Sequence, residues 1–188
     1  MRRLFSKIAF LVILMVSVVV CYAEDKTDDD FGPAKTINTE YFDLYIAPTV
    51  DFSWLSQRLD LRPSDEILAG RSSNSLGLAS GIDSLFLRVC NILDIHLYSY
   101  RGKIKVCQDY NQLDSIYSGL FGTSLANRHS FYVFSLNTIY ISADNFKREI
   151  LGHEIGHAVI SHYFVVLPPV KVQEVLAGYV EYQLRKAD

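Results

Sequence analysis

The stretch "LGHEIGHAVI", residues Leu151–Ile160, contains two histidines four residues apart, with a glutamate directly after the first. On a helix, residues at i and i+4 lie on one face about 5–6 Å apart, so His153 and His157 can both reach one zinc ion. Glu154 lies one step round the helix, where the general base of a zinc hydrolase is found. The motif lies in an apolar segment that no proline interrupts, which favours a zinc-binding helix over a chance occurrence.

A third zinc ligand has to come from outside this motif. A metzincin would need a glycine and a histidine where this chain has Ile160 and Tyr163, so that class is excluded. His162 turns away from the ligand face of an ideal helix. The segment "VQEVLAGYVEYQL", Val172–Leu184, offers two carboxylates instead.

Glu174 and Glu181 lie seven residues apart, on one face of the expected last helix. The small residues Ala177 and Gly178 lie between them and suit close packing against the glycines of the histidine helix. Glu174 is therefore the expected third ligand. Glu181 is expected to be a supporting or structural carboxylate.

The rest of the chain alternates between strand and helix patterns, and the residues from Pro63 to Gly81 are expected to be mostly loop. Expected strands cover residues 41–46, 103–107, 131–135 and 138–142, the last two joined by a tight turn at Leu136–Asn137. Expected helices cover residues 51–59, 82–93, 109–122, about 142–163 and 170–186, with Asp109 and either Ser142 or Asp144 as N-caps. This order predicts an α+β domain.

The N-terminus has the order of a secretory signal peptide: basic residues, the apolar run Ile8–Val20, then Ala23 before an acidic stretch. The run is too short for a membrane-spanning helix, which needs about 20 residues. We therefore expect a signal peptide over residues 1–23, with a lipid on Cys21 as the alternative. Residues 24–39 are expected to be a flexible acidic linker. Residues 40–188 then form the domain.

The whole chain has 18 basic and 21 acidic residues and a formal charge of −3 at pH 7. Such a balance provides no electrostatic footprint for nucleic acid, and no basic stripe marks a membrane surface. We expect an exported protein, periplasmic or secreted, without stable membrane insertion after signal cleavage. Cys90 and Cys107 remain after cleavage, and they form either a disulfide or two separate thiols.

The segments "HEIGH" and "QEVLAGYVEYQL" together resemble the gluzincin metallopeptidases, especially the glutamate helix of their aminopeptidase branch. In size the chain is similar to the compact minigluzincins. The resemblance implies a zincin-like fold, with a small mixed sheet, an active-site helix and a C-terminal glutamate helix. It also implies that His153, His157 and Glu174 bind zinc and that Glu154 is the catalytic base.

By this resemblance the protein is expected to hydrolyse peptide bonds. The hairpin ending in "NTIYIS" is similar to the edge-strand region above the gluzincin cleft, and the strand Thr138–Ser142 is expected to hold an extended peptide. Larger members stabilise the oxyanion with a Tyr or His; the candidates here, each with ordinary packing as its alternative, are His129, His162, Tyr179 and Tyr182. The alternatives to an active enzyme are a latent protease and a zinc-stabilised binding module of the cell envelope.

Overall fold

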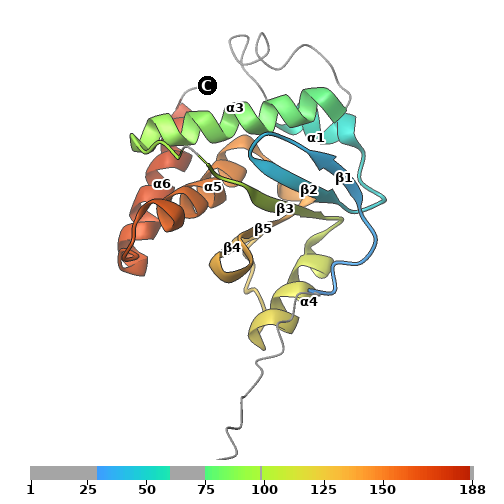
Figure 1. Ribbon diagram of the computed structural model, residues 1–188. Helices are drawn as coiled ribbons and strands as arrows, with labels where there is room; N and C mark the ends of the chain where they lie inside the picture. The colour runs from blue at the N-terminus through green and yellow to red at the C-terminus, as the bar shows by residue number, and fades with distance from the viewer. Residues whose placement is uncertain (1–28, 60–74, 98, 187–188) are drawn as a thin grey trace, which may run out of the picture.

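The computed structural model describes residues 29–59, 75–97 and 99–186. Its centre is a mixed sheet of five strands in the order β1-β2-β3-β5-β4 (Figure 1). The strands β2, β3 and β5 are parallel, and the outer strands β1 and β4 run antiparallel to their neighbours. The strand bounds are β1 Lys35–Asn38, β2 Phe42–Ile46, β3 Gly102–Cys107, β4 Ser130–Val133 and β5 Thr138–Ser142.

One face of the sheet forms the larger core, with α1 (Phe52–Arg58), α3 (Ser75–Leu93), α5 (Arg148–Tyr163) and α6 (Val170–Lys186) on this side (Figure 1). Alternate strand residues point into the core because side chains alternate across a strand. Those that are fully buried there include Leu44, Ile46, Ile104, Val106, Ile139 and Ile141.

In the described part of the chain, α3 is the one helix long and apolar enough to span a membrane. Its apolar side is nevertheless used inside the protein, because Leu78, Ile82, Phe86 and Val89 are buried in the larger core. The helix packs on α1 and α5. We therefore interpret α3 as the core helix of this domain.

The opposite face of the sheet is covered by α4 (Tyr110–Phe121). The side chain of Asp109 accepts a hydrogen bond from the Gln112 amide and caps the start of this helix. Gly122 ends the helix with φ of 70°, a left-handed conformation that glycine adopts without steric cost. A second, smaller core lies under α4 and consists of Phe31, Cys107, Leu113, Ile116, Leu125, Phe131, Val133 and Tyr140.

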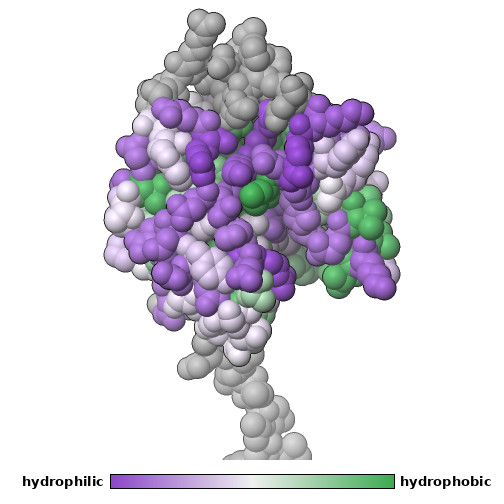
Figure 2. Space-filling model, turned by 180° about the vertical axis from the view of Figure 1, so that it is seen from behind, coloured by the Kyte–Doolittle hydropathy of each residue, from purple (hydrophilic) through white to green (hydrophobic). Residues whose placement is uncertain are grey.

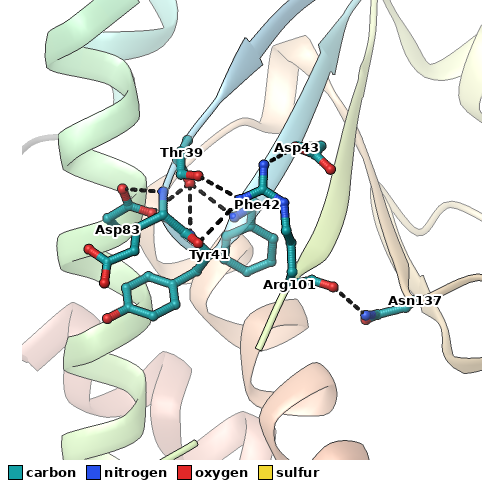
Figure 3. Close-up of polar contacts among 8 residues, drawn as sticks. Thr39, Tyr41, Phe42, Asp43, Asp83, Arg101 and Asn137 are labelled. Carbon is teal, nitrogen blue, oxygen red and sulfur yellow. Dashed lines mark hydrogen bonds and ion pairs between the residues drawn. The ribbon is translucent and has the colours of Figure 1, made fainter. Parts of the chain in front are cut away.

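The turn between β1 and β2 is fastened to α3 and to the start of β3 (Figure 3). Thr39 Oγ1 donates a hydrogen bond of 2.6 Å to Asp83 on α3, and the Tyr41 amide donates to the same carboxylate at 3.2 Å. Arg101 pairs with Asp43 and donates to the Thr39 carbonyl oxygen at 3.1 Å. These contacts fix the turn between β1 and β2 to α3 and to the residue that precedes β3.

The expected elements are largely present, and the differences are local. The helices α1, α4 and α6, and the strands β2 and β3, agree with the sequence patterns to within one or two residues. The helix α3 begins at Ser75, so the end of the expected loop is helical, because Gly77, Leu78 and Gly81 are buried in helix contacts. The expected signal peptide, residues 1–23, lies outside the described residues.

The expected linker is wrong from Asp29 onward. Asp29 and Phe31 are buried, and Lys35–Asn38 forms the edge strand β1. The apolar groups Phe31 and Ile37 pack on the two cores, which a flexible acidic linker would not do. The sheet therefore begins before residue 40, and residues 24–28 lie outside the described part.

Cys90 and Cys107 are two separate, buried thiols. Cys90 lies in the larger core and Cys107 in the smaller one, so the sheet separates them. Burial raises the pKa of the Cys90 thiol to about 11 and that of Cys107 to about 12. The separate-thiol alternative is the one that the structure supports.

Hydrophobic side chains are exposed together where α5 passes into α6, and they form the large green area at the right of Figure 2. Val165 is fully exposed, and Val166 and Val170 are 82% and 70% exposed. Leu167, in the same connection, is 41% exposed and lines the cleft. This apolar connection borders the cleft described below.

Candidate metal centre

The helices α5 and α6 lie close together, and this contact positions the candidate ligands. A Cβ built on Gly156 would lie 3.4 Å from the Ala177 Cα atom, and one on Gly152 would meet the Leu184 side chain at 2.1 Å. The Arg148 guanidinium, at the start of α5, donates to the Leu184 carbonyl oxygen at 3.2 Å, near the end of α6. The two helices are thereby held antiparallel along their length.

Three side chains from these helices converge on one point. The Nε2 atoms of His153 and His157 are 3.2 Å apart. The two carboxylate oxygens of Glu174 lie 3.7 Å from His153 Nε2 and 3.6 Å from His157 Nε2. A tetrahedral zinc ion with ligand bonds of about 2.0–2.1 Å keeps its ligand atoms about 3.3 Å apart. The two imidazoles and the carboxylate therefore fit a metal ion, and they leave a fourth position open.

The second nitrogen of His153 faces another carboxylate. His153 Nδ1 is buried and forms no hydrogen bond of good geometry with the described residues, and Glu181 Oε2 lies 3.3 Å away. An acceptor at this position orients the ring and fixes the tautomer that exposes Nε2. Glu181 thus lies where a supporting carboxylate is expected, and Glu174 lies where a ligand is expected.

Burial of His157 favours the protonation state that can bind a metal ion. Removal from water and the neighbouring His153 ring lower the pKa of His157, and the charge of Glu174 opposes this only in part. A lower pKa favours the neutral imidazole at pH 7. The neutral form is the one that donates a lone pair to a metal ion.

Glu154 lies beside this group and is 6% exposed. Burial, together with the smaller effect of the negative charges of Glu174 and Glu181, raises the pKa of its carboxyl to about 7. A hydrogen bond of 2.7 Å from Ser130 Oγ to Glu154 Oε1 and the charge of Arg128 act in the opposite direction. The result is a carboxyl that can both accept and release a proton near neutral pH.

These groups open into a cleft of about 270 Å³. One wall is the strand β4 with Phe134, and the other is formed by α5, α6 and their apolar connection. The lining residues are Arg128, Ser130, Phe131, Tyr132, Phe134, His153, Glu154, His157, Ser161, Leu167, Val170, Gln173 and Glu174.

The prediction that the strand Thr138–Ser142 holds the substrate is wrong, because the neighbouring strand β4 is the one at the edge of the sheet. Thr138–Ser142 is β5, which pairs with β3 on one side and β4 on the other, and all five of its residues are buried. The strand with a free edge beside the cleft is β4. An extended peptide in the cleft would therefore pair with β4 and not with β5.

None of the four oxyanion candidates lines this cleft in the described part of the chain. His129 packs against the Tyr110 ring, and His162 hydrogen-bonds the Ala158 carbonyl oxygen and packs between Tyr100 and Phe134. Tyr179 and Tyr182 are 47% and 57% exposed on α6. The packing or surface alternative therefore applies to all four.

Ser130 and Arg128 are site residues that the sequence patterns missed. They come from the segment 122–130, which carries no sequence motif. Ser130 forms its hydrogen bond with Glu154, which lies 24 positions later in the sequence. A pattern of neighbouring residues cannot indicate such a long-range contact. Ser130 is the first residue of the edge strand β4, which lines the cleft. Its place in the site could be recognised only after the order of the strands in the sheet was known.

In comparisons with known proteins, no family model, no curated protein and no solved structure matches the chain.

Proposed function

We propose that this protein is an exported zinc peptidase of the gluzincin type, with a zincin-like fold. The observation that carries the proposal is Glu154, a buried carboxyl with a pKa of about 7 beside a set of two histidines and a glutamate that fits a metal ion. A metal site that only stabilises a fold has no use for such a carboxyl, whose burial is costly. A cleft and an unpaired strand edge lie next to it.

In this proposal His153, His157 and Glu174 hold the zinc ion. When bound, zinc polarises the scissile carbonyl and lowers the pKa of the attacking water. Glu154 takes the proton from this water and passes it to the leaving nitrogen. Ser130 Oγ donates a hydrogen bond to Glu154 Oε1 and holds the carboxylate in place for this proton transfer.

The strand β4 holds the substrate in the proposed complex. Its outer edge has free backbone groups that can pair with an extended peptide, as in other cases of strand addition. Ser130 and Tyr132 are on the same face of the strand, toward α5, because side chains alternate along it. The partner is therefore a peptide or an unfolded protein segment.

The first experiment measures the metal content and peptide cleavage of the purified protein, with and without a chelator. The zinc-loaded protein should cleave members of a broad peptide library, and the chelator should abolish this. Glu154→Gln should retain zinc and lose about 100-fold or more in cleavage, the scale of a positioned general base. Glu149→Gln, on the same helix but outside the cleft, is the matched control and should cleave normally.

Equal cleavage by Glu154→Gln and the parent would show that Glu154 is not the base. Failure of the zinc-loaded parent to cleave any peptide would favour the other class of function, a zinc-stabilised binding module or a latent protease. His162→Ala provides a second control: it should retain zinc, whereas His157→Ala should lose it.

A further inference from the structure

The cleft has two chemically different ends. The strand β4 and the helix α5 run side by side in the same direction. Ser130, the first residue of β4, contacts Glu154 near the middle of α5, and Phe134, just after β4, contacts His162 near the end of α5. Arg128 lies before β4, at the end beside Glu154. The opposite end is apolar, because Phe134, Leu167 and Val170 line it.

Arg128 is positioned by an unusual turn. The two residues before it, Ala126 and Asn127, have φ of 53° and 65°, a left-handed conformation that costs a non-glycine residue about 1 kcal/mol or more. Hydrogen bonds hold the turn in place. Asp114 accepts from the Leu125 amide at 2.7 Å, and the Asn127 amide donates to the Tyr110 hydroxyl at 3.2 Å. The chain is thus fixed up to Arg128, which lines the cleft and whose charge acts on Glu154.

The charge of Arg128 is available to a ligand. Its guanidinium lies 5.9 Å from the Tyr117 ring, and no carboxylate of the described residues forms an ion pair with it. It is the one arginine or lysine that lines the cleft in the described part of the chain. A planar guanidinium can bind a carboxylate through two parallel hydrogen bonds.

The free edge of β4 sets the direction of a bound peptide. Antiparallel pairing is slightly the more stable arrangement. An antiparallel peptide runs opposite to β4, so its N-terminal part lies at the Phe134 end and its C-terminal part at the Arg128 end. The candidate metal ligands lie between the two ends.

We propose that Arg128 binds a carboxylate of the substrate on the C-terminal side of the scissile bond. The inference rests on the proposed peptidase function and specifies its substrate class. Two sources carry the same group in a peptide: the free C-terminus and the side chain of Asp or Glu. An apolar residue on the N-terminal side of the scissile bond occupies the end lined by Phe134 and Leu167.

The test compares two pairs of peptides that differ only in this carboxylate. One pair ends in a free carboxylate or in an amide. The other is amidated and has Glu or Gln after the scissile bond. The zinc-loaded parent should cleave the carboxylate member of at least one pair with a kcat/KM about tenfold higher or more, mostly through KM. In Arg128→Gln this ratio should fall toward one, with zinc content unchanged.

Lys103→Gln is the matched control, because it removes an equal charge from an exposed position on β3, outside the cleft. It should keep the full preference. Arg128→Lys should keep part of it, since an ammonium group has the charge without the bidentate geometry. If Arg128→Gln loses the preference for a free C-terminus, the carboxylate that Arg128 binds is the C-terminal one. If it loses the preference for Glu over Gln, the carboxylate is that of an acidic side chain.

Two results would overturn the inference and leave the peptidase function standing. One is equal cleavage of both members of both pairs by the parent. The other is a uniform slowing of all peptides in Arg128→Gln with the preference intact, which would place Arg128 in the reaction step. Absence of cleavage of every peptide by the zinc-loaded parent would overturn the proposed function, and this inference with it.

Discussion

Glu154 combines a buried position with a pKa of about 7, and this has a consequence for stability as well as for chemistry. The folded state raises the pKa above its ordinary value of 4.5, so it binds a proton that the unfolded chain has released. The stability that this provides is complete below about pH 4.5 and is lost as the pH rises through 7. The shift of the Glu154 pKa from 4.5 to about 7 corresponds to a change of roughly 3 kcal/mol in the free energy of unfolding between low and high pH.

We therefore expect Glu154→Gln to stabilise the metal-free protein at pH 8 and to change little at pH 5. An amide stays neutral, so the variant avoids the buried charge that the parent acquires. Thermal unfolding in a chelator at the two pH values measures this. With zinc bound, the neighbouring positive charge lowers the Glu154 pKa and most of the difference should vanish. The same pH dependence in both metal-free proteins would contradict the prediction.

Glu174 and Glu181 test the distinction between a ligand and a supporting carboxylate. Glu174 faces both Nε2 atoms, whereas Glu181 faces only His153 Nδ1. Glu174→Ala should therefore weaken zinc binding most. Glu181→Ala should weaken it by about 10–100-fold, as for other supporting partners of a ligand histidine. Competition with a chromophoric chelator gives both dissociation constants, and the reverse order would assign the ligand to Glu181.

At the level of elements, the contact between α5 and α6 sets the distance between the histidines and Glu174. A Cβ on Gly156 already lies 3.4 Å from the backbone of Ala177, whereas a Cβ on Gly178 has no atom within 4 Å. The expected packing of α6 on the glycines is thus correct for Ala177 and wrong for Gly178, which faces open space. The same substitution should therefore be harmful at Gly156 and tolerated at Gly178.

Gly156→Val should push the helices apart, lower stability by about 1–3 kcal/mol and weaken zinc binding more than tenfold, because Glu174 moves with α6. Gly178→Val should leave both quantities nearly unchanged, or raise stability by a few tenths of a kcal/mol through its better helix propensity. Thermal melts without metal and zinc titrations separate the two effects. Unchanged zinc affinity in Gly156→Val would show that the spacing of the helices does not position the ligand.

The elements also show how far the sequence predicts this fold. His153, His157 and Glu174 could be found because each depends on spacing along one helix, and helix periodicity is local. The order of β4 and β5 could not, because both have strand patterns and only pairing with β3 decides which is internal. The start of α5 was missed for a similar reason. Ser142 precedes a short 3-10 turn, and the helix begins at Arg148, whose partner is on α6.

At the scale of the whole molecule, one buried ion pair fastens the N-terminal segment to the sheet. Lys105 Nζ lies 2.7 Å from Asp29 Oδ1 and 2.5 Å from Oδ2, and the Tyr140 hydroxyl donates to the same carboxylate. Burial alone would raise the pKa of Asp29. The hydrogen bonds from Lys105 and Tyr140 and the charge of Lys105 outweigh it, so the pKa lies below its usual value of 3.8.

Loss of this anchor should therefore destabilise the domain in a pH-dependent way. Asp29→Asn leaves Lys105 charged and largely buried, which should lower the free energy of unfolding at pH 7 by about 3 kcal/mol. A carboxyl with a lowered pKa stabilises the fold above its unfolded pKa and ceases to do so as the pH falls through the folded value. The difference between parent and variant should accordingly shrink below about pH 4.

The matched control is Asp43→Asn, which breaks the ion pair with Arg101. The Arg101 side chain is 50% exposed and that of Asp43 is 30% exposed. Solvent screens that pair, so its loss should cost less than about 1 kcal/mol. Urea unfolding at pH 7 and at pH 3.5 measures all three proteins. Equal destabilisation by the two substitutions would mean that the segment from Asp29 contributes no more than a surface contact. A larger effect of Asp29→Asn would show that the domain extends through Asp29, into the segment whose composition predicts a linker.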